Sequence, residues 1–278
     1  MREVRFVKMH GAANDFVLID DRDCGFPAAD RRLLAALGTP RTGIACEGII
    51  LVRPSETADF RMVFFNPDGS EADLCGNGAR CVAAFAKEIG AAKDALMAFE
   101  TRAGMVYAEV LDAERVKVWM PEPKDRRFGI DVDGTAGDFI VAGVPHFVVG
   151  CDDVAKVDVD GLGRRLRNAE AFAPAGTNVD FAQFVSPNQV FLRTYERGVE
   201  AESGACGTGS VAAAVVAAET RGLSLPIDVH TSQGFVLTIG EDSRPDGNYG
   251  FTLTGPVRRV FEGTVDLDGL ASACSAVD

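Results

Sequence analysis

The sequence predicts an α/β (α+β) protein made of two similar, pseudo-symmetric domains, and three observations support this prediction. The chain has 278 residues, which is long for one ordinary domain and comfortable for two. Most segments with regular composition read as strands, and only a few read as helices. One unit of strand, polar loop, Cys-Gly-x-Gly and Ala-rich helix occurs twice.

The strands are expected where β-branched and aromatic residues cluster between Gly, Pro and Asp. These segments are Val4–Lys8, Phe16–Asp20, Gly48–Arg53, Phe60–Asn66, Met105–Leu111, Arg115–Met120, Phe139–Val141, Phe147–Val149, Val179–Val185, Val190–Glu196, Phe235–Ile239 and Gly250–Thr254. The expected helices are Asp30–Leu37, Ala79–Ile89, Gly163–Asn168 and Val211–Thr220.

The repeated unit organises this pattern. In the first half a strand ends at Asn66, and a turn-rich loop leads to Cys75-Gly76-Asn77-Gly78 and an Ala-rich helix. In the second half a strand ends at Glu196, and a loop leads to Cys206-Gly207-Thr208-Gly209 and another Ala-rich helix. The simplest inference is an internal duplication. We expect the two domains to face each other across a pseudo-two-fold axis, each presenting a Cys at a helix start to a shared cleft.

Composition excludes several classes of protein. The formal net charge is −13, so nucleic acid and anionic membrane surfaces are poor partners. No apolar window approaches a membrane span and no secretory leader is recognised, so we expect a cytoplasmic protein. The seven cysteines are odd in number and none has C-x₂-C spacing, and the three histidines are scattered. We therefore expect neither a disulfide framework nor a metal site.

The helix starts indicate a particular chemistry. The first turn of a helix has backbone N–H groups without partners and partial positive charge, so it binds a carboxylate well. Glycines leave room for such a ligand, and a Cys there is expected to have a lowered pKa. A thiolate on one side of an α-carbon and a thiol on the other would remove and return a proton and so invert the stereocentre. Cys75 and Cys206 are the candidate pair.

Other interpretations are weaker. A single Cys-Gly-x-Gly is more often a tight turn than a site, but two copies in matched contexts favour function. A phosphate-binding loop would need G-x-x-x-x-G-K-[ST], which does not occur. Racemisation with pyridoxal phosphate would leave both cysteines without a role. A protein that binds amino acids without turnover remains the alternative that is not an enzyme.

The motifs also carry a resemblance to a known family. The sequence closely resembles diaminopimelate epimerase over nearly the whole chain. The segments that carry the resemblance are Lys8–Phe16, Phe65–Glu71, Cys75–Cys81, Pro145-His146, Gly176–Asn178, Tyr195–Gly198 and Ala205–Gly209.

The resemblance implies a fold, an activity and a set of site residues. Each domain would be a mostly antiparallel, barrel-like sheet around a central helix, with the active site in the cleft between the domains. The protein would be a homodimer without a cofactor and would interconvert LL- and meso-2,6-diaminopimelate, a step towards lysine and peptidoglycan. The catalytic residues would be Cys75 and Cys206, with His146 and Glu196 as an auxiliary pair. Substrate would contact Asn14, Asn66, Gly76, Asn77, Asn178, Glu196, Arg197, Gly207 and Thr208.

Two positions depart from the family pattern. Many members have a Gln near the position of Gly48 and an Asn before the Pro-His pair, where this chain has Val144. In the family both positions serve the distal end of the substrate. The alternative is therefore a racemase of another amino acid, such as histidine or glutamate, that uses the same cysteine pair.

The domain boundary is expected at the Pro121-Glu122-Pro123 turn. The first domain would comprise residues 1–121, with about 264–278 returning to it by analogy with the family, and would carry Cys75. The second would comprise residues 122–263 and carry Cys206.

Overall fold

The chain divides into two compact units. The computed structural model describes residues 2–185 and 187–274. Unit 1 comprises Met1–Val118 and Pro256–Asp278, and unit 2 comprises Trp119–Gly255. The expected boundaries lay after residue 121 and near residue 263. The chain returns to unit 1 before β18 (Arg258–Asp266), because this whole strand pairs with β1 (Glu3–Gly11) of unit 1.

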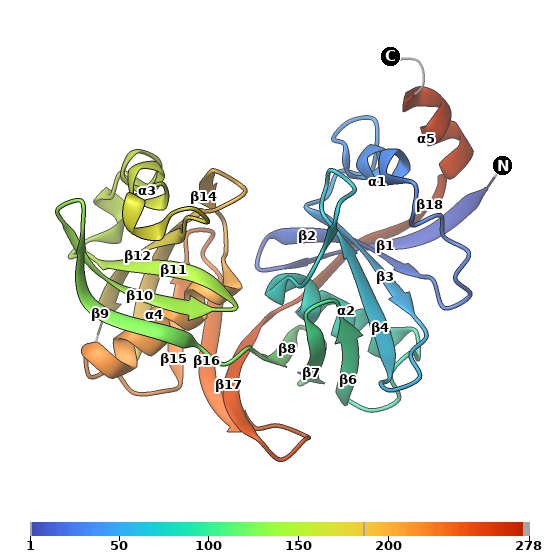
Figure 1. Ribbon diagram of the computed structural model, residues 1–278. Coiled ribbons are helices and arrows are strands. Elements are labelled where there is room, and N and C mark those ends of the chain that lie inside the picture. Colours follow the sequence, from blue (N-terminus) through green and yellow to red (C-terminus); the bar gives the residue numbers. More distant parts are fainter. Residues whose placement is uncertain (1, 186, 275–278) are drawn as a thin grey trace. The chain divides into compact units, whose positions relative to one another are not determined.

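Unit 1 consists of one curved sheet and three helices (Figure 1). Its other strands are β1 (Glu3–Gly11), β2 (Asn14–Asp20), β3 (Gly48–Arg53), β4 (Phe60–Phe65), β5 (Glu71–Ala72), β6 (Leu96–Thr101), β7 (Gly104–Val110) and β8 (Arg115–Trp119). Its helices are α1 (Arg31–Gly38), α2 (Gly76–Glu88) and α5 (Leu267–Cys274).

Unit 2 has the same kinds of element. Its strands are β9 (Lys124–Val132), β10 (Thr135–Ala142), β11 (Val144–Gly150), β12 (Asn178–Val185), β13 (Gln189–Glu196), β14 (Ala201–Ser203), β15 (Ile227–Thr231), β16 (Val236–Ser243) and β17 (Tyr249–Pro256). Its helices are α3 (Val159–Arg167) and α4 (Gly207–Thr220), with short 3₁₀ turns η1 (Val154–Lys156) and η2 (Glu170–Phe172).

The two units share one strand topology, which confirms the predicted fold class of two similar domains. In unit 1 the pairing order is β18-β1-β2-β3-β4-β6-β7-β8, and only β2–β3 and β4–β6 are parallel. In unit 2 it is β9-β10-β11-β12-β13-β15-β16-β17, and only β11–β12 and β13–β15 are parallel. Each of these strands in one unit therefore has an equivalent in the other.

A central helix fills the inside of each curved sheet. Helix α2 contacts β1, β2, β3 and β7, and α4 contacts β10, β11, β12, β13, β15 and β16, so strands surround each helix (Figure 1). Residues of α4 from Val211 to Ala217 are all buried. A helix that is apolar all round is stable only inside a core. The Ala-rich composition allows strands to approach α4 closely on every side.

A second layer covers the outer face of each sheet. In unit 1, Leu33, Leu34 and Leu37 of α1 join a core with Val17 and Ile49. In unit 2, Val159 and Leu166 of α3 join a core with Phe147, Val179 and Phe181. Strands β2 and β11 are therefore buried on both faces, which explains their continuous apolar runs.

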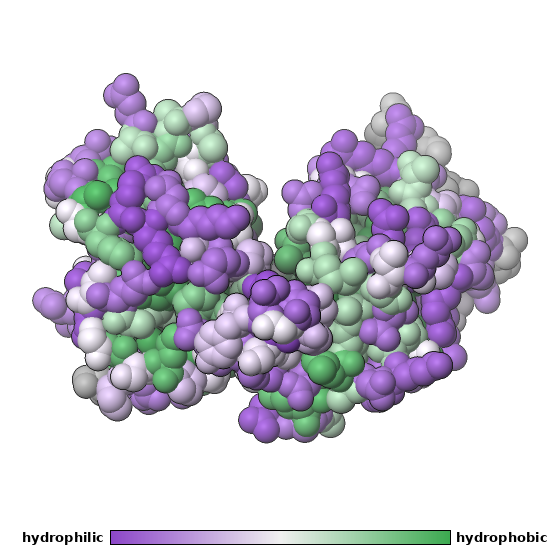
Figure 2. All heavy atoms as spheres, turned by 60° about the horizontal axis from the view of Figure 1, so that its bottom comes forward, coloured by the Kyte–Doolittle hydropathy of each residue, from purple (hydrophilic) through white to green (hydrophobic). Residues whose placement is uncertain are grey.

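Hydrophilic residues cover much of the face seen in Figure 2, and small apolar patches lie between them. None of the helices that the structure describes is long and apolar enough to span a membrane.

The two central helices begin earlier than expected. The sequence predicted helix from Ala79 and Val211, whereas α2 begins at Gly76 and α4 at Gly207. Glycine is a poor helix former, so its presence hid the first turn. The difference matters because it places each Cys directly at the N-cap. Strands β5, β6, β9, β14 and β15 and helix α5 were not expected from the sequence.

Candidate active site

Cys75 lies at the N-cap of α2. Its backbone is extended, with φ −130° and ψ 123°, and its carbonyl accepts the first helical hydrogen bond, from Ala79 N at 2.7 Å. The Cys75 thiol lies 3.8 Å from Asn14 Oδ1, and the Asn14 amide nitrogen donates to the Glu47 carboxylate. The amide orientation of Asn14 is thereby fixed, with its oxygen towards the sulfur.

A buried cation supports the first turn of α2. Arg80 is fully buried, and its guanidinium donates to Asn77 Oδ1 at 2.8 Å and to Gly76 O at 3.4 Å. Burial lowers the pKa of Arg80 to about 10, while the charges of Cys81 and Cys75 act in the opposite direction. Arg80 thus orients Asn77 and places positive charge beneath the start of the helix.

Asn66 closes the loop that leads to Cys75. It follows β4, its backbone N–H donates to Ser70 O at 2.8 Å, and its side-chain amide donates to Ser70 Oγ at 3.1 Å. These bonds form a tight turn in which Gly69 has φ +77°. Asn66 has a local structural role in addition to its expected contact with substrate.

Cys206 occupies the equivalent N-cap, at the start of α4, and is 8% exposed. Its sulfur accepts a hydrogen bond from Gly209 N at 3.4 Å and lies 3.4 Å from Thr208 Oγ1. Burial raises the pKa of the Cys206 thiol well above its usual value, and the charges of Glu196 and Asp180 raise it further. The expectation that the helix start lowers the pKa is wrong for Cys206, because burial and two carboxylates outweigh the helix amides.

His146 connects this thiol to a buried acid. Its Nε2 lies 3.0 Å from Thr208 Oγ1, and its Nδ1 lies 2.6 Å from Asp180 Oδ2. The other carboxylate oxygen of Asp180 accepts a hydrogen bond from Thr194 Oγ1 at 2.6 Å. His146 and Asp180 are fully buried. Cys206, Thr208, His146 and Asp180 therefore form one hydrogen-bonded line.

Asn178 and Arg197 flank this line. The backbone N–H of Arg197 donates to Asn178 Oδ1 at 2.8 Å, and the Asn178 amide donates to Pro145 O at 3.2 Å. The Arg197 guanidinium donates to the carbonyls of Ala175 and Gly176 at 3.3 and 3.4 Å. Arg197 thus holds the loop before β12 in this structure.

Glu196 is the last residue of β13, and its carboxyl is largely buried. Burial raises the pKa of Glu196 and the charge of Asp180 raises it further, while the nearby Ser203 hydroxyl acts in the opposite direction. A carboxyl that retains its proton more strongly in the folded state is suited to exchanging a proton with a neighbouring thiol.

The raised pKa of Glu196 has a consequence for stability. In the pH range between its unfolded and folded pKa values, the folded state holds the proton and the unfolded state does not. Stability therefore falls as pH rises from about 4.3 through the folded pKa and then levels off. We expect Glu196→Gln to lack this fall, as measured by urea unfolding at several pH values. Parallel pH curves for the variant and the original chain would contradict the expectation.

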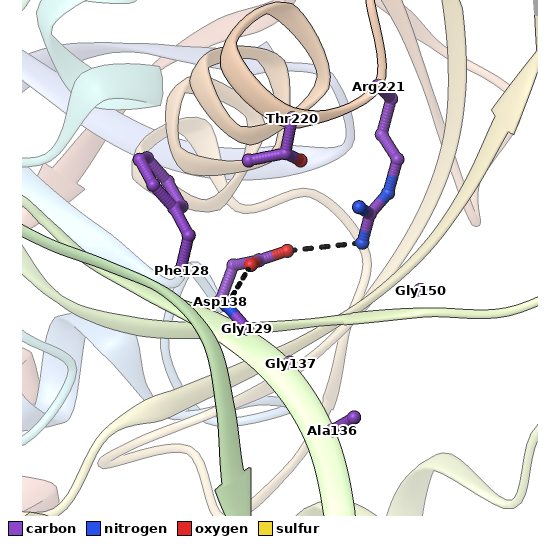
Figure 3. A pocket seen from close by; sticks show the side chains of 8 residues that line it. All are labelled: Phe128, Gly129, Ala136, Gly137, Asp138, Gly150, Thr220 and Arg221. Carbon is purple, nitrogen blue, oxygen red and sulfur yellow. Dashed lines mark hydrogen bonds and ion pairs between the residues drawn. The ribbon is translucent and has the colours of Figure 1, made fainter.

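A separate cavity lies at the opposite end of α4 from Cys206. It has a volume of about 440 Å³ and is bordered by Thr220, Arg221, Asp138 and Phe128 (Figure 3). Asp138 accepts hydrogen bonds from Gly129 N at 2.8 Å and from Arg221 at 3.3 Å. None of the predicted site residues borders it, and its two charges satisfy each other. We do not assign it to the substrate.

Gly48, one of the two departures from the family pattern, is enclosed. A side chain there would meet Phe64 Cε2 at 2.4 Å and Phe65 O at 3.1 Å. A Gln at position 48 would therefore need Phe64 to move.

Four residues that contact the Cys75 helix start or the hydrogen-bonded line at Cys206 were not expected from the sequence: Glu47, Arg80, Asp180 and Thr194. One signal was available, because Asp180 interrupts the apolar strand Val179–Val185 with a charge. The partner of that charge depends on strand register, which the sequence does not give.

Solved structures define the class of fold. The match to a Bacillus anthracis protein of the PhzF family covers 96% of this chain and 100% of that protein's chain, with a TM-score of 0.71 and 17% identity. The match to a probable proline racemase from Agrobacterium radiobacter covers 98% of this chain and 95% of that protein's chain, with a TM-score of 0.69 and 18% identity. The chain thus has the duplicated α+β fold of these proteins.

Sequence similarity defines the family within that class. The model for diaminopimelate epimerase matches residues 6–125 and 139–260. A diaminopimelate epimerase of Aquifex aeolicus is 42% identical, over 94% of this chain and 97% of the relative. One of Archaeoglobus fulgidus is 38% identical, over 96% and 98%. The chain belongs to the diaminopimelate epimerase family, which confirms the resemblance.

Proposed function

We propose that this protein is an isomerase that converts LL-2,6-diaminopimelate to meso-diaminopimelate without pyridoxal phosphate. Membership of the diaminopimelate epimerase family supports this activity. The observation that carries the mechanism is the matched pair of helix starts, each with a Cys at its N-cap followed by Gly-x-Gly. Two equivalent proton-transfer groups suit a reaction that runs in both directions.

In the proposed mechanism one cysteine acts as thiolate and the other as thiol. The thiolate removes the α-proton from one face, and the thiol donates a proton to the opposite face. The net result is inversion, with one proton taken up and one released, after which the two sulfurs have exchanged protonation states. The raised pKa of Cys206 supports a thiol at that position before substrate arrives. Cys75 would then be the first base, and the reverse direction would use Cys206.

The substrate carboxylate would bind backbone N–H groups of the helix starts. The first turn of a helix presents backbone N–H groups to a ligand, and Gly76, Asn77, Gly207 and Thr208 lie in the first turns of α2 and α4. The same donors would stabilise charge that develops on the carboxylate as the α-proton leaves. Asn14, Asn66, Asn178, Glu196 and Arg197 are proposed to contact the remaining polar atoms. His146 and Glu196 are proposed to set the protonation of the cysteines.

The test is exchange and inversion at the α-carbon in D₂O, followed by NMR with separate substrates. We expect LL-diaminopimelate to exchange and to yield the meso form, and histidine, glutamate and lysine to remain unchanged. Turnover of histidine or glutamate alone would retain the cysteine mechanism and overturn the substrate. Saturable binding of diaminopimelate without any exchange would overturn the proposed activity.

We further propose a cytoplasmic homodimer that acts in the synthesis of lysine and peptidoglycan precursors. This assignment follows the family. Sedimentation equilibrium tests the assembly, and we expect a species of twice the mass of one chain. A single species with the mass of one chain would contradict it.

A further inference from the structure

Three polar residues of unit 2 lie buried on the strands beneath the start of α4. His146, Asp180 and Thr194 come from β11, β12 and β13, and are 0%, 0% and 3% exposed. Asp180 joins the other two, because its oxygens lie 2.6 Å from His146 Nδ1 and 2.6 Å from Thr194 Oγ1. A buried carboxylate is costly unless it is hydrogen-bonded, and here both oxygens are.

The surrounding groups determine which nitrogen of His146 carries the proton. The backbone N–H of Arg197 only donates, so the atom of Asn178 that faces it is the amide oxygen. The Asn178 NH₂ group therefore faces Pro145 O, which only accepts, and His146 Nε2 at 3.5 Å. Nε2 thus faces one fixed donor, the Asn178 amide, and one hydroxyl, Thr208, that can donate to it, which fits an unprotonated Nε2 and an Nδ1–H that donates to Asp180.

The equivalent positions in unit 1 show that the fold does not need this polar group. His146 pairs with Asn178 as Phe16 pairs with Gly48, and Asp180 pairs with Thr194 as Ile50 pairs with Phe64. The three equivalents are Phe16, Ile50 and Phe64. Phe16 and Phe64 pack edge to face with centroids 6.1 Å apart. An apolar trio fills this place in one unit, so the polar trio in the other calls for a functional reason.

The glycine in the first turn of α4 makes room for the carboxylate. A Cβ on Gly209 would lie 2.5 Å from Asp180 Oδ1. The equivalent Gly78 would place a Cβ 3.1 Å from Ile50 Cδ1, a side-chain methyl group. Asp180 is therefore packed directly against the helix turn that carries Cys206 and Thr208.

We propose that Asp180 is a positioning residue that fixes His146 as the Nδ1–H tautomer and so sets the direction of the hydrogen bonds that reach Cys206. Nε2 accepts a hydrogen bond from the Thr208 hydroxyl, and the Thr208 oxygen in turn accepts a hydrogen bond from the Cys206 thiol. Cys206 is thereby held as a thiol, the form that can supply a proton to the substrate. The inference deepens the proposed function and rests on it for the role of Cys206.

Without the Asp180 carboxylate, the direction of the hydrogen bonds from His146 through Thr208 to Cys206 is no longer fixed. An imidazole with a proton on Nε2 would donate to Thr208, whose hydroxyl would turn towards Cys206 and favour the thiolate. The titratable groups that face Cys206 are Asp180 from β12, His146 from β11 and Glu196 from β13. Of these, only Asp180 contacts His146 Nδ1.

The first test uses the unaltered protein. The chain has three histidines, so ¹⁵N NMR of histidine-labelled protein gives few signals, and His146→Gln identifies the one of interest. We expect a protonated Nδ1 and an unprotonated Nε2 at pH 7.5. Protonation of Nε2, or of both nitrogens, would overturn the proposal. This measurement does not depend on activity, so it stands apart from the substrate assignment.

The second test compares Asp180→Asn with Asp228→Asn. Asp228 also accepts a hydrogen bond from a threonine, Thr238 Oγ1 at 2.7 Å, but on β15 and without a histidine. We expect Asp180→Asn to lose the His146 signal pattern and to lower kcat for diaminopimelate by about 10²-fold with KM unchanged. Asp228→Asn should retain both.

Thr194→Val provides a milder variant if Asp180→Asn folds poorly. It removes one hydrogen bond to the carboxylate and should lower kcat by roughly tenfold. Full kcat in both variants of the trio, or an equal loss in Asp228→Asn, would overturn the proposal. An unaltered protein that does not epimerise diaminopimelate but has the expected tautomer would instead refute the proposed function.

Discussion

Replacing Cys75 or Cys206 by Ala is expected to lower kcat for inversion of diaminopimelate by about 10²–10⁴-fold, because each variant lacks one of the two proton-transfer groups. The two variants should nevertheless fold, because both positions are N-caps with an extended backbone that alanine adopts without strain. The assay is inversion in D₂O, followed by NMR and by separation of the stereoisomers.

Exchange and inversion need to be measured separately. A single remaining base would exchange the α-proton with retention of configuration, whereas inversion requires both cysteines. The controls are Cys24→Ala, at an exposed thiol, and Cys81→Ala, at a buried thiol of α2 whose pKa is raised by burial to about 12. Both controls should invert the substrate. Inversion at the original rate by Cys75→Ala or Cys206→Ala would exclude the two-base mechanism.

Gly209→Ala is expected to have the second largest effect. The added methyl group would lie 2.5 Å from Asp180 Oδ1 and 3.3 Å from the Cβ of Cys206, so the carboxylate or the helix start must move. Overpacking of this kind typically costs about 1–3 kcal/mol of stability. A shift of about 1 Å in a catalytic group reduces rate by roughly 10²-fold. We therefore expect a lower midpoint in urea and a much lower kcat.

Gly78→Ala is the matched control in the other unit. Its Cβ would lie 3.1 Å from a methyl group of Ile50 and 3.4 Å from Phe16, and side-chain atoms of this kind can shift by a few tenths of an ångström. We expect a smaller loss of stability and of kcat than for Gly209→Ala. Equal losses in the two variants would show that the glycines serve only the helix turn and that Asp180 has no special place there.

The sequence by itself determined the duplication and the main chemical groups. Two copies of strand, loop, Cys-Gly-x-Gly and helix predicted two similar α+β domains, and the topology of the two units confirms this. Local signals sufficed here, because glycines beside a Cys and an Ala-rich run are visible in a short window. The family resemblance was visible for the same reason.

Only the tertiary structure decided the surroundings of these groups. The duplication predicted equivalent cysteines, yet Cys206 lies on a line of His146 and Asp180 where the other unit has Phe16 and Ile50. That difference depends on the register of strands that are far apart in the sequence. The raised pKa of Cys206 likewise depends on burial and on the nearby carboxylates of Asp180 and Glu196. Desolvation and charge at a site are set by what packs around it, and this packing is formed by residues distant along the chain.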